Sequence, residues 1–195
     1  MSISATLQSR ALIPQLMNQS KVGTRTRSQL GTVLLGVGLL SLLAQVTIRL
    51  PFTPVPITGQ TFGVFLVTLL LGRRMATATV ISYLGVGAIG LPVFAMGQAG
   101  LAIGPTMGYL LGMLVSSFVV GTLADCGYAK TFLSCLGLGV VSSVCVFGFG
   151  LAGLSFFIPS EMLFSAGFIP FIPGDLIKTV TASLIVTGAS KQLNS

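Results

Sequence analysis

Asp175 and Lys178 stand three residues apart in the segment "GFIPFIPGDLIKTVTASLIVTG" (residues 167–188), which carries no other charge. On a helix, a spacing of three places both head groups on one face, with their Cβ atoms about 5–6 Å apart. A carboxylate accepts hydrogen bonds and an ammonium donates them. The pair therefore suits a neutral, planar ligand with N–H donors on one edge and a carbonyl on the other, and a ureido ring fits that description.

A second interpretation of the pair stays open. If a helix begins near Gly174, Asp175 lies in its first turn, where a carboxylate caps free N–H groups and meets the positive end of the helix dipole. Lys178 would then extend its ammonium to the lipid headgroups. This interpretation explains the acid better than the base, because a lysine in the first turn opposes the dipole and costs roughly 2.5–3.5 kcal/mol if carried inward.

The elements that position this pair are predicted to be membrane helices. Mean hydropathy is +0.99, 53% of residues are hydrophobic and 7% are charged, which leaves too little polar surface for a water-soluble protein. We therefore expect an all-α, polytopic membrane protein. Apolar runs separated by Pro, Gly and charge predict six transmembrane helices, at about residues 30–48, 59–72, 75–91, 105–124, 131–153 and 174–190.

The positions of Lys and Arg predict the orientation of these spans. Eight of the ten lie in the N-terminal segment, the second and fourth connections and the C-terminus: Arg10, Lys21, Arg25, Arg27, Arg73, Arg74, Lys130 and Lys191. Because positive charge is retained in the cytoplasm, both termini are expected there. Residues 1–29 are interpreted as a basic cytoplasmic segment without the features of a secretory signal, and residues 30–195 as the transmembrane domain.

Several functional classes are disfavoured by composition. The chain has no histidine, and its three acids are far apart, so neither a catalytic site nor a metal site is expected. Its three cysteines form no metal-binding or disulfide pattern, and no phosphate-binding P-loop motif occurs. The basic residues make no stripe interleaved with aromatics, which argues against nucleic acid. We expect a protein that is not an enzyme.

Small residues recur every four positions in the fourth predicted span, at Gly104, Gly108, Gly112 and Ser116. Such a stripe lets another helix approach closely, which is a main source of packing energy in lipid. We favour packing inside the bundle, and docking against a separate membrane protein is the alternative.

Four stretches together extend the interpretation: "PFTPVPITGQTFGVFLVTLLLG" (51–72), "GAIGLPVFA" (87–95), "GPTMGYLLG" (104–112) and "PFIPGDLIK" (170–178). In this order they resemble the BioY family, whose members are biotin-binding S components of energy-coupling factor transporters. The resemblance implies a six-helix protein of the plasma membrane that captures biotin from outside. It also implies that Asp175 and Lys178 belong to the biotin site.

In the family the loop between the third and fourth helices closes over the ligand, which implies that Gly97, Gln98, Ala99 and Gly100 lie near it. Gln98 is either a partner of the ligand's carboxylate or a solvated loop amide. Tyr109 is either an aromatic wall of the site or a lipid-interface tyrosine. Weaker candidates are Thr58, Gln60 and Phe171, and Arg49 is interpreted as an anchor at the headgroups.

No cofactor is expected, because biotin is the transported ligand. The resemblance implies as partners an energy-coupling transmembrane subunit and two ATPase subunits, and transport by the chain alone stays open. The small-residue docking motif of S components has only approximate matches here, Thr32-x-x-x-Gly36 and Ser41-x-x-x-Gln45. Alternatives are an S component for another vitamin and a non-transport membrane association protein.

Overall fold

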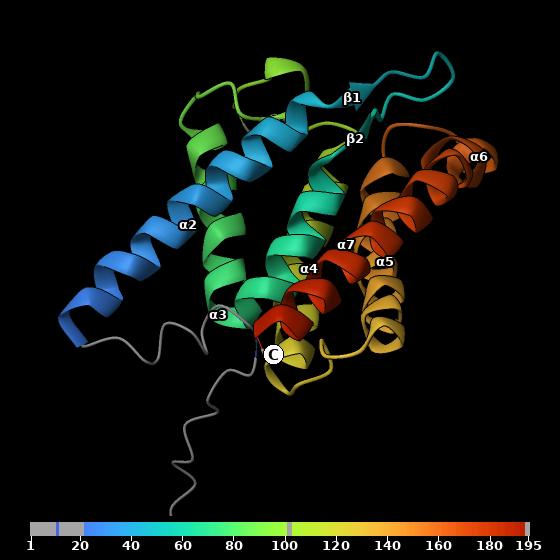
Figure 1. Cartoon of the computed structure of the whole chain (residues 1–195). Coiled ribbons are helices and arrows are strands. Elements are labelled where there is room, and N and C mark those ends of the chain that lie inside the picture. Colours follow the sequence, from blue (N-terminus) through green and yellow to red (C-terminus); the bar gives the residue numbers. More distant parts are fainter. Residues whose placement is uncertain (1–10, 12–21, 101–102, 194–195) are drawn as a thin grey trace, which may run out of the picture.

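The structure is a computed structural model that describes Ala11, residues 22–100 and residues 103–193, and these residues form a mainly helical bundle (Figure 1). The long helices are α2 (Val22–Gln45), α3 (Gln60–Ala88), α4 (Met107–Asp125), α5 (Phe132–Leu154) and α7 (Ile172–Leu193). Short helical turns are η1 (Ala95–Gly97), η2 (Ser160–Met162), α6 (Leu163–Gly167) and η3 (Ile169–Phe171). Arg10 and Lys21, which belong to the predicted basic cytoplasmic segment, lie outside the described residues.

The prediction of a helical membrane protein is confirmed. Within the described residues, five helical stretches are long and apolar enough to cross a membrane: Arg27–Gln45, Gln60–Ala88, Met107–Asp125, Phe132–Leu154 and Ser160–Gln192. An antiparallel ladder that the sequence did not predict joins β1 (Thr47–Ile48) to β2 (Ile57–Thr58). Helix α2 also begins at Val22, inside the segment expected to precede the first span.

Helix α3 folds back on itself at Gly72. The backbone there has φ 70° and ψ −178°, a conformation that is essentially restricted to glycine. Gln60 Nε2 donates to the Tyr83 hydroxyl at 2.5 Å, although a straight helix would separate these residues by about 35 Å. The element is therefore two antiparallel arms, residues 60–71 and 73–88, which match the predicted spans 59–72 and 75–91 (Figure 1).

The fold-back is fixed by α4. The carboxylate of Asp125 accepts a hydrogen bond from the backbone N–H of Arg73 at 3.1 Å, so it caps the start of the second arm from a different helix. The Arg73 guanidinium lies 5.4 Å from the centre of the Phe118 ring. Gly121 packs directly on the Arg73 backbone, where a Cβ would lie 2.6 Å from the Arg73 Cα.

Small residues bring α4 and α5 into backbone contact. A Cβ on Gly112 would lie 2.8 Å from both the Cys145 carbonyl oxygen and the Val146 Cα, and Gly108 packs against the α5 backbone in the same way. One turn further along α4, the hydroxyls of Ser116 and Ser142 are hydrogen-bonded at 2.8 Å. Gly108, Gly112 and Ser116 therefore serve packing inside the bundle, which was the favoured interpretation, whereas Gly104 precedes α4.

The bundle has two distinct ends. The fold-back of α3, the α4–α5 connection and the C-terminal end of α7 lie at one end (Figure 1). The β1–β2 ladder, the segment after α3 and α6 lie at the other end. Arg73, Arg74, Lys130 and Lys191 thus share the first end, and Arg49 lies at the second.

Replacing Gly72 tests the fold-back. Gly72→Ala forces a Cβ into a backbone conformation that costs about 1–3 kcal/mol, so we expect a lower unfolding temperature in detergent. The matched control is Gly85→Ala in the second arm, where a Cβ meets no atom within 4 Å and alanine favours the helix. Equal unfolding temperatures for both variants would contradict the fold-back.

The α4–α5 contact yields a second prediction. Gly112→Ala pushes a methyl group into the α5 backbone, and such overpacking costs about 1–3 kcal/mol. Gly148→Ala on α5 is the control, because its added methyl group faces open space. The unfolding temperature in detergent should fall for Gly112→Ala and change little for the control.

Candidate functional site

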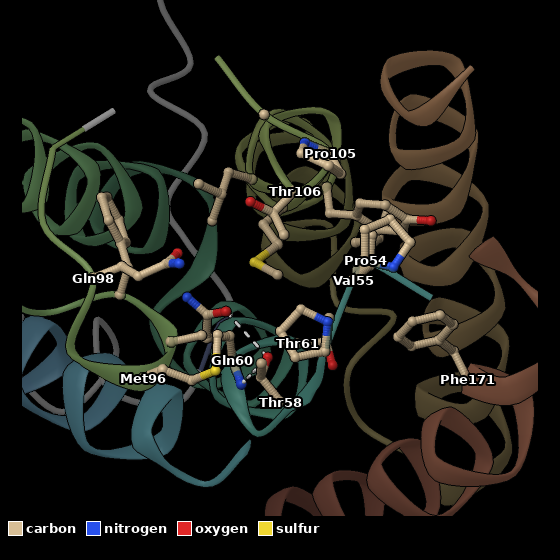
Figure 2. A pocket seen from close by; sticks show the side chains of 18 of the residues that line it. Pro54, Val55, Thr58, Gln60, Thr61, Met96, Gln98, Pro105, Thr106 and Phe171 are labelled. Carbon is tan, nitrogen blue, oxygen red and sulfur yellow. Dashed lines mark hydrogen bonds between the residues drawn. The ribbon is translucent and has the colours of Figure 1, made fainter. Parts of the chain in front are cut away.

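A cavity of about 400 Å³ lies at the end of the bundle that carries the β1–β2 ladder (Figure 2). Its walls come from the β1–β2 loop, the start of α3, the segment after α3, and helices α4, α5 and α7. The volume lies within the range of about 300–1,000 Å³ that is typical of small-molecule sites. Among the residues that line it, Asp175 and Lys178 are the charged ones.

The ammonium of Lys178 points into the bundle. Its Nζ donates to the Thr58 carbonyl oxygen at 2.7 Å and to the Thr61 hydroxyl at 3.0 Å, and Lys178 also lines the cavity. A lysine that reached for the headgroups would not have these partners. The geometry therefore disagrees with the capping interpretation of Lys178, in which the side chain extends to the membrane surface.

Asp175 has a partner on a different helix. The Ser143 hydroxyl of α5 donates to the Asp175 carboxylate. The acid is therefore held from α5 while the base is held from β2 and the start of α3. Since both side chains line the same cavity, an acceptor and a donor are presented to one space from one face of α7, as the spacing of three predicted.

Aromatic rings form the wall opposite the polar start of α3. The Tyr109 and Phe147 rings are 6.5 Å apart edge to face, and Phe171 lies 6.2 Å from both. The Tyr109 hydroxyl donates to the Gly167 carbonyl oxygen at 2.7 Å, and its ring packs against Gly150. Tyr109 is 6% exposed, so it is a cavity wall and not a lipid-interface residue.

The segment after α3 supplies the remaining predicted residues. Gln98, Ala99 and Gly100 line the cavity, whereas Gly97 is not among its lining residues. The backbone N–H of Gly97 instead donates to Gln45 Oε1 at 3.0 Å, on the side of α2. The neighbouring residue Met96 also lines the cavity, and its φ of 60° is rare for a side chain of this size (Figure 2).

Polar residues near the β1–β2 ladder join the site. Thr58 and Gln60 were weaker candidates, and both line the cavity; the Thr58 hydroxyl donates to Gln60 Oε1 at 3.1 Å (Figure 2). Phe171, another weaker candidate, also lines it. Arg49 does not, although its Nε donates to the Met96 sulfur at the same end of the bundle.

Sequence reasoning missed two partners of the charged pair, Thr61 and Ser143. Thr61 directly follows the named candidates Thr58 and Gln60, so a polar face at the start of the second predicted span could have indicated it. Ser143 lies inside an apolar span rich in small residues, and no local signal separates it from the packing serine Ser142.

The charged pair yields a stability prediction. The pair is partly buried, and replacing a buried pair of charges with hydrophobic side chains of similar volume is often neutral or stabilising. We therefore expect the double variant Asp175→Asn/Lys178→Met to unfold in detergent at the same temperature as the parent or above it. A loss of more than about 1 kcal/mol would mean that the pair is structural.

Comparison with known proteins supports one family. The model of the BioY family matches residues 17–195. A biotin transporter BioY of Thermotoga maritima is 40% identical over 147 residues, covering 74% of this chain and 86% of the relative. The Rhizobium etli biotin transporter BioY is 35% identical over 172 residues, covering 82% and 91%.

One solved structure has the same fold. It is the S-component for biotin from an ECF-type ABC transporter, which superposes with a TM-score of 0.77. The alignment covers 88% of this chain and 95% of that chain, at 27% identity.

Proposed function

Because this chain belongs to the BioY family, we propose that it takes up biotin as the substrate-capture component of an ECF-type vitamin transporter. The family is one of transporter components, and the chain is not an enzyme. The observation that carries the proposal beyond the family is that Asp175 and Lys178 both line the same cavity. No cofactor is needed, since biotin is the cargo.

In this proposal the ureido ring of biotin lies between the two charged residues. The Asp175 carboxylate accepts the ureido N–H groups, and the Lys178 ammonium donates to the ureido oxygen. Thr58 and Thr61 already hold the ammonium in position, which lowers the cost of ordering it on binding. The apolar ring of biotin packs on the aromatic wall of Tyr109, Phe147 and Phe171.

The acyl chain of biotin then runs toward the segment after α3. Gln98 and the backbone of Ala99 and Gly100 line the cavity on that side and are proposed to meet the carboxylate. Gly97 supports this segment from behind, because its N–H is bonded to Gln45.

We further propose that the protein crosses the plasma membrane six times, with both termini in the cytoplasm. The two arms of α3 supply two of the six spans, since Gln60 and Tyr83 meet across the fold-back. The end with Arg73, Arg74, Lys130 and Lys191 then faces the cytoplasm, in keeping with the retention of positive charge. The cavity opens at the opposite, outward end.

We propose that the energy for transport comes from partners, namely an energy-coupling transmembrane subunit and two ATPases. The approximate docking motifs on α2 do not identify the contact. A Cβ on Gly36 would lie 2.7 Å from a side-chain carbon of Thr79, so Gly36 packs inside the bundle. Gln45 is bonded to the segment after α3. The proposal of these partner subunits therefore rests on membership of the BioY family.

Removing either charge should weaken biotin binding. A hydrogen bond to a charged group contributes about 1.5–3 kcal/mol, so Asp175→Asn and Lys178→Ala should each raise the Kd for biotin roughly 10- to 100-fold. Binding of labelled biotin to the purified protein measures this, with thiamine and riboflavin as competitors.

Matched controls change the same charges away from the cavity: Glu161→Gln in η2 and Lys191→Ala near the end of α7. Both should bind biotin like the parent. Absence of saturable biotin binding by the parent protein would refute the substrate, and displacement by thiamine or riboflavin would indicate another vitamin.

A further inference from the structure

Residues 93–98, called the strap below, form a loop that is bonded to itself, and Phe94, Ala95, Met96 and Gln98 of this loop line the cavity. Phe94 N–H donates to the Gln98 carbonyl at 3.1 Å, and Gln98 N–H donates to the Ala95 carbonyl at 3.3 Å. Gly97 N–H donates to the Phe94 carbonyl at 3.1 Å. Because these backbone bonds close inside the strap, it can keep its shape while it moves relative to the helices.

The strap separates two cavities. Beside the biotin cavity lies a second one of about 320 Å³, lined on its outer side by Arg49, Leu50 and Thr53. Met96 and Gln98 line both cavities, together with Pro54 and Pro56 of the β1–β2 loop. A molecule that passes directly from the second cavity into the first must therefore displace these shared residues, of which Pro54, Met96 and Gln98 are labelled in Figure 2.

Side chains from two helices tie the strap down. The Tyr83 hydroxyl donates to the Val93 carbonyl at 3.1 Å. The Gln45 amide, at the end of α2, donates to the Phe94 carbonyl at 3.1 Å and accepts from Gly97 N–H at 3.0 Å. Phe94 also packs edge to face on the Tyr83 ring, with centroids 5.4 Å apart.

The same tyrosine is connected to the charged pair. Gln60, which lines the cavity, donates to the Tyr83 hydroxyl, and its side-chain oxygen accepts from Thr58. The Thr58 carbonyl in turn accepts from the Lys178 ammonium. A continuous set of hydrogen bonds thus joins the ammonium to the strap, and Tyr83, 1% exposed, lies at its centre.

We propose that Tyr83 and Gln45 are positioning residues that hold the strap over the cavity, so that release of their hydrogen bonds sets how fast biotin enters and leaves. This inference rests on the proposed function for its ligand. It assigns to Tyr83 and Gln45 the rates at which biotin associates and dissociates, whereas Asp175 and Lys178 are proposed to determine the affinity for biotin.

Two variants remove the hydrogen bonds that hold the strap while preserving side-chain length. Gln45→Met loses the two bonds that join the amide to the strap, together with a bond to the Ser41 carbonyl in its own helix, and Tyr83→Phe keeps the ring on Phe94 while losing the hydroxyl. We expect each to raise both the association and the dissociation rate of labelled biotin, by roughly tenfold for Gln45→Met and less for Tyr83→Phe. The Kd should change less than either rate.

Two further variants separate positioning from general stability. Gln45→Glu can still accept from Gly97 N–H but can no longer donate to Phe94, so its rates should fall between those of the parent and Gln45→Met. Ser41→Ala, one turn earlier on α2, removes a hydroxyl that donates within its own helix to Val37, and it should leave the rates unchanged.

Hydrogen exchange of the strap amides provides a readout that needs no biotin. In the full-length protein without added ligand, exchange at residues 94–98 should be faster in Gln45→Met and Tyr83→Phe than in the parent or in Ser41→Ala. A merely structural role would lower the unfolding temperature and leave this local exchange unchanged.

The inference would be overturned if both variants kept the hydrogen exchange of the strap amides and the biotin association and dissociation rates of the parent. A higher Kd caused by slower association alone would also overturn it. If the parent protein binds no biotin, the proposed function fails. Strap exchange then still decides whether Tyr83 and Gln45 hold the segment.

Discussion

An ammonium inside an apolar bundle needs acceptors from the protein, because lipid supplies none. Lys178 finds them in the Thr58 carbonyl and the Thr61 hydroxyl, at the end of the bundle that carries the β1–β2 ladder. This interaction connects the last helix to β2 and to the start of α3. It also aims the charge into the cavity where Asp175 lies.

The arrangement explains why a chain with thirteen charged side chains places two of them here. Asp175 is held by Ser143 of α5, so the acid and the base are anchored by different elements around the same space. A ligand with complementary polarity on its two edges can bind without much rearrangement of either residue. Such preorganisation reduces the ordering cost that binding must overcome.

Much of this could be predicted from the sequence. Apolar runs located the helices, and the spacing of Asp175 and Lys178 placed both on one face, because a helix has a fixed period. Gln98 and Tyr109 also line the cavity as expected. Local pattern could not identify Ser143 or Thr61 as partners, since those contacts depend on how α7 packs against α5 and α3.

Other differences have the same origin. Gly97 belongs to the segment that was expected near the ligand, but its N–H is bonded to Gln45 on another helix, a contact far away in sequence. The two-residue ladder between β1 and β2 is too short to produce an alternating pattern. Gly36, read from the sequence as part of a docking motif, is instead used to approach Thr79.

The fold-back of α3 has a consequence for biogenesis. At 1.5 Å per residue, the first arm spans about 18 Å and the second about 24 Å, and both are shorter than a hydrocarbon core of about 30 Å. Each arm is therefore a short span. We therefore expect the two arms to insert together as a helical hairpin, in which Gln60 and Tyr83 can pair.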